Sequence, residues 1–206
     1  MSLDEGQNFV NIACVVRAFK KVPLQLGKTG VVFGPGNAGL IMLQMLKMAG
    51  AHRVAMVGTR DFRLKMAETL GAAHTVNVRR EDPAQALAKW YPEGFDTAVE
   101  ASGSVSALQG CFDVVRPGGA VIVFGMFAER LKDFDPAFLY YKEPTIYGCK
   151  GAAGAFEEAL HLLEGKRLEI LPLITHRFPL AETPAAFKTF EDKTPEAMRI
   201  VIEVPA

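Results

Sequence analysis

The stretch that decides the fold runs from Val31 to Leu40 and reads VVFGPGNAGL. It begins as an apolar strand and leads through glycines at positions 34, 36 and 39 into a long apolar run. Glycine disfavours both strands and helices, so a cluster of glycines between the two indicates a demand on the backbone itself. With this spacing the first glycine allows a tight turn, the second lets a ligand approach, and the third lets the helix pack closely on the sheet.

Strand and helix patterns alternate along the chain on both sides of this stretch. Residues 9–19 predict an apolar helix. Short apolar segments predict strands at 29–33, 53–57, 74–78, 95–101, 120–125 and 144–148. Further helices are expected at 40–50, 63–72, 82–90 with Asp82 as N-cap, and 105–115 ending at the RPGG of residues 116–119. This alternation predicts an α/β fold, a Rossmann-type doubly wound parallel sheet of about six strands with helices on both faces.

The pattern changes from Gly151 onward. Residues 155–168 and 183–192 predict amphipathic helices, the second capped by Thr183, and residues 175–180 and 197–204 predict extended segments. These elements predict a C-terminal helix-strand extension that packs against another part of the protein. We therefore divide the chain into an entry segment and helix (1–26), a Rossmann domain (27–150) and a C-terminal extension (151–206).

The composition narrows the classes of function. Among 206 residues, 23 basic and 23 acidic side chains cancel, and half of the residues are hydrophobic. This predicts a globular protein with no electrostatic basis for binding nucleic acid or an anionic membrane. The three cysteines are widely spaced, which argues against a disulfide framework or a structural zinc site. With no signal peptide or membrane segment in the pattern, we expect a cytoplasmic protein.

The glycine-rich stretch predicts a dinucleotide site, because it follows a strand, opens a helix and lies in a complete strand-helix-strand unit. The pyrophosphate of a dinucleotide would lie at the N-terminus of that helix, where free N–H groups and the helix dipole favour negative charge. Glycine-rich turns also occur for packing alone. The candidate cofactor-binding residues of the loop are Gly34, Gly36, Asn37, Ala38 and Gly39.

The end of the next strand indicates which dinucleotide is preferred. A site for NAD carries an acidic residue there, whereas this chain has Gly58 followed by Thr59 and Arg60. Glycine leaves room for the 2′-phosphate of NADP, threonine can donate to it, and arginine can pair with it. The sequence therefore favours NADP, with NAD as the alternative cofactor. The competing interpretation is a solvated turn.

Five segments together resemble one family, the medium-chain dehydrogenases/reductases, and within it the zinc-type alcohol and polyol dehydrogenases. The likeness extends from about Val10 to the C-terminus and rests on LGKTGVVFGPGNAGLIMLQMLKMAGAHRV, FDTAVEASGS, VVRPGGAVIVFGMF, PTIYG and THRFPLAETPAAF. The resemblance implies that two further loops contact the cofactor and that a basic residue of the last strand approaches its pyrophosphate. These residues are Ala101, Ser102 and Gly103, then Phe124, Gly125 and Met126, and finally Arg199.

The chain also departs from this family. Nothing in it corresponds to the N-terminal GroES-like catalytic domain, which the resemblance implies as the holder of the zinc and of the small alcohol or carbonyl substrate. Val10 stands where the family has an acidic zinc ligand. Cys14 and the four scattered histidines lack metal-ligand spacing, and the serines at 102, 104 and 106 have no partnered base. We therefore predict neither catalytic nor metal-binding residues in this chain.

These observations predict the cofactor-binding portion of an NADP-preferring alcohol or polyol dehydrogenase, in which zinc belongs only to the full-length enzyme. This portion is expected to be inactive alone. The alternatives are a zinc-free quinone or enoyl reductase of the same superfamily, which Val10 favours, and a non-catalytic dinucleotide sensor. Members of the family often pair through the edge strand after the fifth, here residues 145–148, so the resemblance also implies a homodimer.

Overall fold

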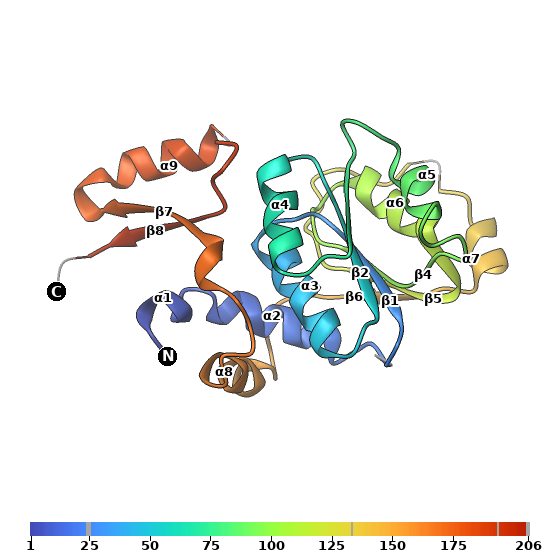
Figure 1. Cartoon of the computed structure of the whole chain (residues 1–206), viewed down its shortest axis with the longest axis horizontal. Helices are drawn as coiled ribbons and strands as arrows, with labels where there is room; N and C mark the ends of the chain where they lie inside the picture. The colour runs from blue at the N-terminus through green and yellow to red at the C-terminus, as the bar shows by residue number, and fades with distance from the viewer. Residues whose placement is uncertain (24–25, 133, 193, 205–206) are drawn as a thin grey trace.

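A parallel sheet of six strands forms the centre of the molecule, with helices on both of its faces (Figure 1). The computed structural model describes residues 1–23, 26–132, 134–192 and 194–204. The strands are β1 (Thr29–Phe33), β2 (Arg53–Gly58), β3 (His74–Asn77), β4 (Phe95–Glu100), β5 (Val115–Val123) and β6 (Thr145–Gly148). They lie in the order β3-β2-β1-β4-β5-β6, and every neighbouring pair is parallel. The predicted Rossmann-type fold is confirmed.

Successive residues of each strand face two separate apolar cores, as the two-residue period of a strand requires. Val32 and Val99 face one core, and Val31 and Ala98 face the other. The first core is covered by α2 (Phe9–Phe19), α3 (Asn37–Met48), α4 (Asp61–Thr69) and α8 (Phe156–Glu164). The second is covered by α5 (Pro83–Ala88), α6 (Val105–Val114) and α7 (Ala137–Lys142). Burial on both faces explains why the strands read as nearly continuous apolar runs.

The strand order reverses between β1 and β4. The chain places β1, β2 and β3 side by side in one direction and then returns to add β4 on the other side of β1. The carboxyl ends of β1 and β4 meet there, where Phe33 pairs with Glu100. Open α/β sheets bind ligands at such a reversal, outside the carboxyl ends of the strands.

Several element boundaries differ by a few residues from the sequence prediction. The helix predicted from residue 40 begins at Asn37, so residues 37–39 of the glycine loop belong to the first turn of α3. The strand predicted from residue 120 begins at Val115, because the pairing of β4 with β5 continues through a register shift across the RPGG segment. The sequence pattern also missed α7. Its described residues are all at least partly exposed, so it lacks a strong apolar period.

A second, smaller sheet follows α8 and forms what we call the C-terminal lobe (residues 171–192 and 194–204). It contains β7 (Ile174–Pro179) paired with the parallel β8 (Arg199–Glu203), the helix α9 (Thr183–Glu191), and the 3-10 turns η1 (Leu171–Leu173) and η2 (Leu180–Glu182). The prediction that Thr183 caps α9 is wrong. The N-cap is Glu182, and the Thr183 hydroxyl donates to the Leu180 carbonyl at 2.7 Å.

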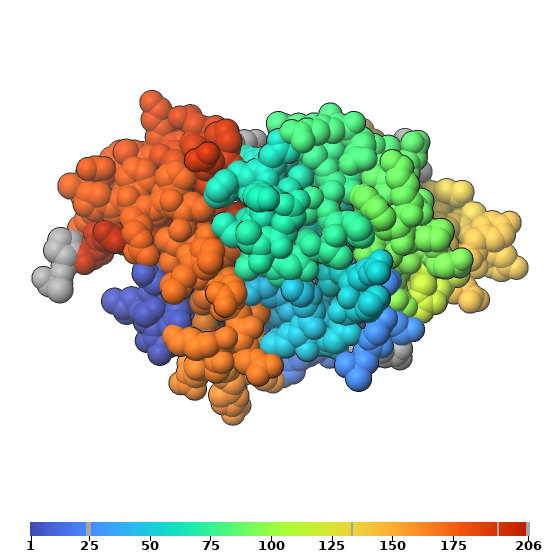
Figure 2. Space-filling view, in the orientation of Figure 1, coloured from blue at the N-terminus to red at the C-terminus, as the bar shows by residue number. Residues whose placement is uncertain are grey.

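Polar contacts fasten the lobe to the rest of the chain. Arg177 of β7 pairs with Asp4 of α1 (Leu3–Gly6), at 2.6 Å. Arg63 of α4 donates to the Ala197 carbonyl at 2.6 Å. Figure 2 shows the lobe, in orange and red, in contact with the turquoise segment that contains α4. Residues 24 and 25 of the predicted entry segment, and 193, 205 and 206 of the predicted extension, lie outside the described residues.

The described helices are short. The longest of them, α3, has 12 residues. Within the described ranges, no helix has both the length and the apolarity needed to cross a membrane.

Candidate functional site

A cavity of about 680 Å³ opens at the carboxyl edge of the sheet, at the reversal of strand order. Segments that follow β1, β2, β3 and β4 form its walls, so the residues come from four separate parts of the sequence. Seven of the predicted cofactor-binding residues line it, namely Gly34, Gly36, Gly58, Thr59, Arg60, Ala101 and Ser102. The topology therefore brings together the glycine loop, the Gly58–Arg60 turn and the loop after β4.

The three glycines of the loop have different surroundings. Gly34 has φ +108°, a conformation that side chains rarely adopt, and an added β-carbon would lie 2.9 Å from the Ser102 nitrogen. A β-carbon at Gly39 would lie 2.0 Å from the Gly34 carbonyl oxygen. At Gly36, by contrast, no atom of the described residues lies within 4 Å of an added β-carbon. Packing accounts for the first and third glycines, whereas the second faces open space.

The N-terminus of α3 lies directly after Gly36, which lines the cavity. Gly36 is the N-cap residue, and no side chain accepts a hydrogen bond there. The first amides of a helix have no partner within the helix, so an anion at this end would satisfy them and would also meet the positive end of the helix dipole. An open, uncapped helix start beside a cavity fits the pyrophosphate of a dinucleotide.

The wall beyond β2 carries two arginines. Arg60 and Arg63 both line the cavity, and among the described residues neither forms an ion pair. The nearby Asp61 carboxylate is engaged instead by Asn77 and Arg80. Burial, together with the positive charge of Arg60, lowers the pKa of Arg63. The turn after β2 therefore carries more positive than negative charge, which an anionic ligand would offset, while the carboxylates Asp82 and Asp113 line other parts of the cavity.

Gly58 is also constrained by packing. A β-carbon there would lie 2.4 Å from Cγ of Pro35, in the glycine loop. An acidic residue at this position would have to displace Pro35. The turn is thus built without the carboxylate that would repel a 2′-phosphate.

The loops after β4 and β5 pack against each other. A β-carbon at Gly103 would lie 2.4 Å from the Met126 carbonyl oxygen, and one at Gly125 would lie 2.2 Å from the Gly103 nitrogen. Met126 is 94% exposed. The predicted residues Gly103, Phe124, Gly125 and Met126 therefore form one ridge, next to the cavity wall made by Ser102.

Other predicted residues do not line the cavity. Ala38 and Gly39 lie within α3, and the side-chain amide of Asn37 is buried without a partner among the described residues. Arg199 lies on β8 in the C-terminal lobe, where it donates to the carbonyl of Gln7. Its predicted role at the pyrophosphate stays a prediction.

Two residues that sequence reasoning missed belong to the site. Arg63 lines the cavity three residues after Arg60, and a second basic residue on the first turn of the helix was a signal that could have found it. Glu100, the last residue of β4, is fully buried immediately before the Ala101–Gly103 loop. Its signal in the sequence was a carboxylate directly after the apolar residues Ala98 and Val99 of this strand.

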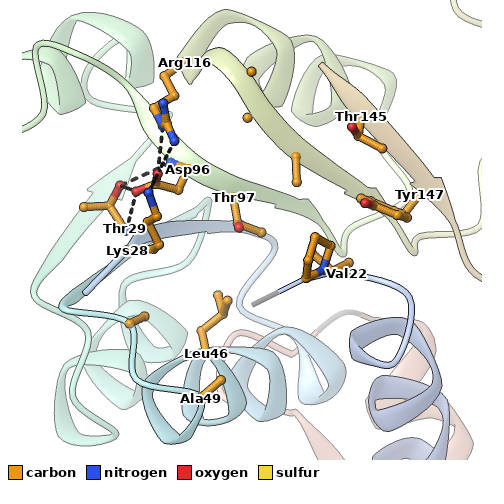
Figure 3. Close-up of a pocket in the computed structure, with 15 residues that line it drawn as sticks. Val22, Lys28, Thr29, Leu46, Ala49, Asp96, Thr97, Arg116, Thr145 and Tyr147 are labelled. Carbon is orange, nitrogen blue, oxygen red and sulfur yellow. Dashed lines mark hydrogen bonds and ion pairs between the residues drawn. The ribbon is translucent and has the colours of Figure 1, made fainter. Parts of the chain in front are cut away.

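A second cavity, of about 180 Å³, lies near the amino ends of the strands, at the opposite end from the first cavity (Figure 3). Asp96 dominates its polar end and accepts hydrogen bonds from the backbone and hydroxyl of Thr29, at 2.8 and 3.0 Å, and from Arg116 at 2.7 Å. Lys28 lies 3.4 Å away. Burial alone would raise the pKa of Asp96, but these hydrogen bonds outweigh it and lower the pKa. The cluster ties together β1, β4 and β5, which is a structural role.

The residues that the structure describes contain no group of three or more His, Cys, Asp or Glu side chains arranged to hold a metal ion.

Comparison with known proteins adds independent findings. A family model described as zinc-binding dehydrogenase matches residues 38–165. D-arabitol-phosphate dehydrogenase from Enterococcus avium is 33% identical over 201 residues, covering 94% of this chain and 55% of that protein. Sorbitol dehydrogenase from Gallus gallus is 29% identical over 209 residues, covering 98% and 57%. A solved putative zinc-binding dehydrogenase from Sinorhizobium meliloti 1021, bound to NADP, superimposes with a TM-score of 0.86 at 22% identity, covering 98% of this chain and 59% of that one. The chain thus spans a little over half the length of these proteins.

Proposed function

The chain belongs to the zinc-binding dehydrogenase family, and we propose that it is the nucleotide-binding portion of an alcohol or polyol dehydrogenase that prefers NADP. The observation that carries this proposal is the cavity at the carboxyl edge of the sheet. It combines an open Gly36 at an uncapped helix N-terminus with two arginines on the facing wall. Two relatives that cover nearly the whole chain, a D-arabitol-phosphate and a sorbitol dehydrogenase, support the polyol class.

In such an enzyme the nicotinamide, when bound, accepts or donates the hydride. The residues of this chain bind and orient the cofactor. The α3 N-terminus holds the pyrophosphate, the Gly58–Arg60 turn and Arg63 hold the adenosine end, and the ridge of Gly103 and Phe124–Met126 flanks the nicotinamide end.

The preference for NADP rests on charge and space at the turn after β2. Arg60 and Arg63 lack carboxylate partners among the described residues, so a 2′-phosphate would supply the missing negative charge. The crowding of Gly58 against Pro35 excludes an acidic side chain that would bind the ribose hydroxyls of NAD instead. That the Sinorhizobium meliloti structure holds NADP is compatible with this preference.

Fluorescence titration with NADPH and NADH tests this proposal. The wild type is expected to bind NADPH more tightly. Arg60→Ala is expected to raise the Kd for NADPH by about 10- to 150-fold, the effect of one charge-assisted hydrogen bond, and to change the Kd for NADH little. Arg79→Ala, on the exposed turn after β3, is the matched control and leaves both values unchanged. Equal affinities in the wild type, or an unchanged Kd in Arg60→Ala, would contradict the preference for NADP.

The C-terminal lobe is proposed to pack on the GroES-like catalytic domain of the family. Its sheet has two strands, fewer than an independently stable sheet usually needs. Phe187 and Phe190 of α9 are 62% and 69% exposed, and Leu180 is 52% exposed. Such side chains are normally covered, and the catalytic domain would cover them and supply the substrate pocket. On this proposal the chain alone binds the cofactor but does not oxidise alcohols.

A homodimer through the edge strand is the second proposed partnership. β6 has one free edge, and its Ile146 is 42% exposed. An open edge of this kind offers unpaired N–H and C=O groups to a second copy. A sedimentation mass of one chain at micromolar concentration, unchanged by Ile146→Lys, would contradict this pairing.

A zinc-free quinone or enoyl reductase of the same superfamily is the second candidate function. The observation that favours it is Val10, which stands at the acidic ligand position and is 58% exposed. Reconstitution with a GroES-like domain discriminates the two candidates. Alcohol oxidation that depends on added zinc supports the dehydrogenase, and quinone reduction without zinc supports the reductase.

A further inference from the structure

Glu100 is fully buried, with 0% of its surface exposed, although the cavity begins at the next residue. A buried carboxyl group is costly unless it is hydrogen-bonded. Its Oε1 atom accepts three hydrogen bonds, from the Ser102 amide at 2.7 Å, the Ser102 hydroxyl at 2.6 Å and the Gly103 amide at 2.9 Å. Its Oε2 atom is buried without a partner among the described residues. The Glu100 side chain therefore holds the loop after β4 through its hydrogen bonds with Ser102 and Gly103.

The loop after β5 contacts the same residue. The main-chain carbonyl of Glu100 accepts from the amides of Phe124 and Gly125, at 2.9 and 3.1 Å. A β-carbon at Gly125 would lie 2.4 Å from Glu100 Oε2. The side chain of Glu100 thus fills the space between the Ser102–Gly103 segment and the Phe124–Met126 segment. Its atoms prevent either segment from moving into that space.

Ser102 connects this arrangement to the glycine loop. A β-carbon at Gly34 would lie 2.9 Å from both the nitrogen and the β-carbon of Ser102. A shift of Ser102 would therefore disturb the turn that leads to Gly36. Glu100 contacts Ser102, and Ser102 lies against Gly34. One buried side chain therefore touches or adjoins three loops of the site: the glycine loop and the loops after β4 and β5.

We propose that Glu100 is a positioning residue for dinucleotide binding, which holds the loops after β4 and β5 in their binding conformation before the ligand arrives. The inference rests on the proposed function in that the ligand is a dinucleotide. A loop that is fixed in advance loses no further freedom on binding, whereas a loop released from Glu100 would have to be ordered by the ligand at the expense of affinity.

Two substitutions at Glu100 and one control test this inference by NADPH titration. Glu100→Ala removes all three side-chain hydrogen bonds and is expected to raise the Kd at least tenfold. Glu100→Gln keeps a carbonyl oxygen that can accept from Ser102 and Gly103, and it is expected to stay within threefold of the wild type. Thr97→Val, also buried in β4 but near its other end, is the control and leaves the Kd within twofold.

Hydrogen exchange in the nucleotide-free protein provides the readout that a general loss of stability would not reproduce. The amides of Ser102 and Gly103 are expected to exchange at least tenfold faster in Glu100→Ala, while those of Val32 and Val99 in the sheet stay protected. If Glu100→Ala does not fold, Ser102→Ala replaces it, with about threefold weaker binding and faster exchange at Gly103 expected.

The inference is overturned if Glu100→Ala, or Ser102→Ala in its place, binds NADPH as the wild type does, or if the loop amides exchange at the wild-type rate. Equal loss of affinity in Glu100→Gln and Glu100→Ala also overturns it. Failure of the proposed function looks different. The wild type would then bind neither NADPH nor NADH, and the exchange rates of Ser102 and Gly103 in the free protein would still decide whether Glu100 holds the loop.

Discussion

Gly36 and Gly39 are three residues apart, yet their absent side chains serve opposite purposes. At Gly39 the backbone of the preceding turn takes the place of a β-carbon, with the Gly34 carbonyl oxygen only 2.0 Å from where it would be. At Gly36 the same place is empty, and φ is −83°, which any residue can adopt. The fold requires glycine at position 39, whereas packing among the described residues does not require it at position 36, where the proposed dinucleotide would approach.

Substitution by alanine should separate these two roles without any ligand. Gly39→Ala is expected to destabilise the protein by about 1–3 kcal/mol, because the new methyl group must displace the Gly34 carbonyl. Gly36→Ala, the matched control, should leave the free energy of unfolding within about 0.5 kcal/mol. Urea denaturation of both variants measures this difference. Equal stability of the two variants would refute the packing role of Gly39.

At the residue scale, the sequence revealed those side chains whose role is set by local geometry. The spacing of Gly34, Gly36 and Gly39 predicts a turn, and the close approach of Gly39 to the Gly34 carbonyl lies within that one segment. The contacts of Glu100 and Arg63 depend on where the loop after β4 and the C-terminal lobe come to lie. Such contacts between distant segments leave no local pattern in a single sequence.

At the scale of elements, α7 depends on one lysine. Lys142 Nζ donates to three carbonyls at the end of α6 and the start of β5, those of Phe112, Asp113 and Val115, at 2.8 to 2.9 Å. Burial lowers the pKa of Lys142. The ammonium group also lies 5.9 Å from the ring centre of Phe138. Lys142 therefore holds α7 against the C-terminus of α6.

Replacing this lysine tests the attachment of α7. Lys142→Met is expected to lower the free energy of unfolding by about 1–3 kcal/mol, because three carbonyls lose their donor. Lys89→Met is the control, since Lys89 is exposed and its side chain has no hydrogen bond among the described residues. Thermal denaturation of both variants gives the comparison. A melting temperature for Lys142→Met equal to that of the control would show that α7 is held by its aromatic contacts alone.

The elements that sequence reasoning placed correctly are those with a strong apolar period or a specific cap. Asp82 accepts from the Gln85 amide at 2.8 Å, as its position before Pro83 predicted. Thr183 had the same kind of signal, but η2 precedes it and moves the cap to Glu182. The start of β5 at Val115 depends on pairing with Phe95, a contact between strands that a single segment cannot reveal.

At the scale of the whole molecule, ion pairs fasten the first residues of the chain to distant parts. Glu5 is buried, pairs with Lys166 after α8, and accepts from the Ser2 backbone at 2.6 Å. Hydrogen bonding to Lys166, and then to Ser2, lowers the pKa of Glu5 from 4.5 to about 2. A carboxyl group whose pKa is lower in the folded state stabilises the fold above its unfolded pKa.

The lower pKa of Glu5 in the folded state determines how stability should depend on pH. The contribution of Glu5 is complete above about pH 4.5 and is lost as the pH falls toward about 2. Urea denaturation between these values should show a smaller fall in stability for Glu5→Gln than for the wild type. Glu68→Gln, whose partner Lys65 lies 3.4 Å away on an exposed helix face, is the control. A pH profile of Glu5→Gln that parallels the wild type would contradict the assigned role of the pair.

The most direct test of the account combines Gly36→Val with the melting temperature in the presence and absence of saturating NADPH. At a hundredfold excess over Kd the wild type should gain about 2.7 kcal/mol. Gly36→Val should melt like the wild type without ligand, because its side chain enters open space, and should gain nothing from NADPH. A wild type that does not respond to NADPH, or a Gly36→Val protein that melts early and still responds, would contradict the assignment of this cavity to a dinucleotide.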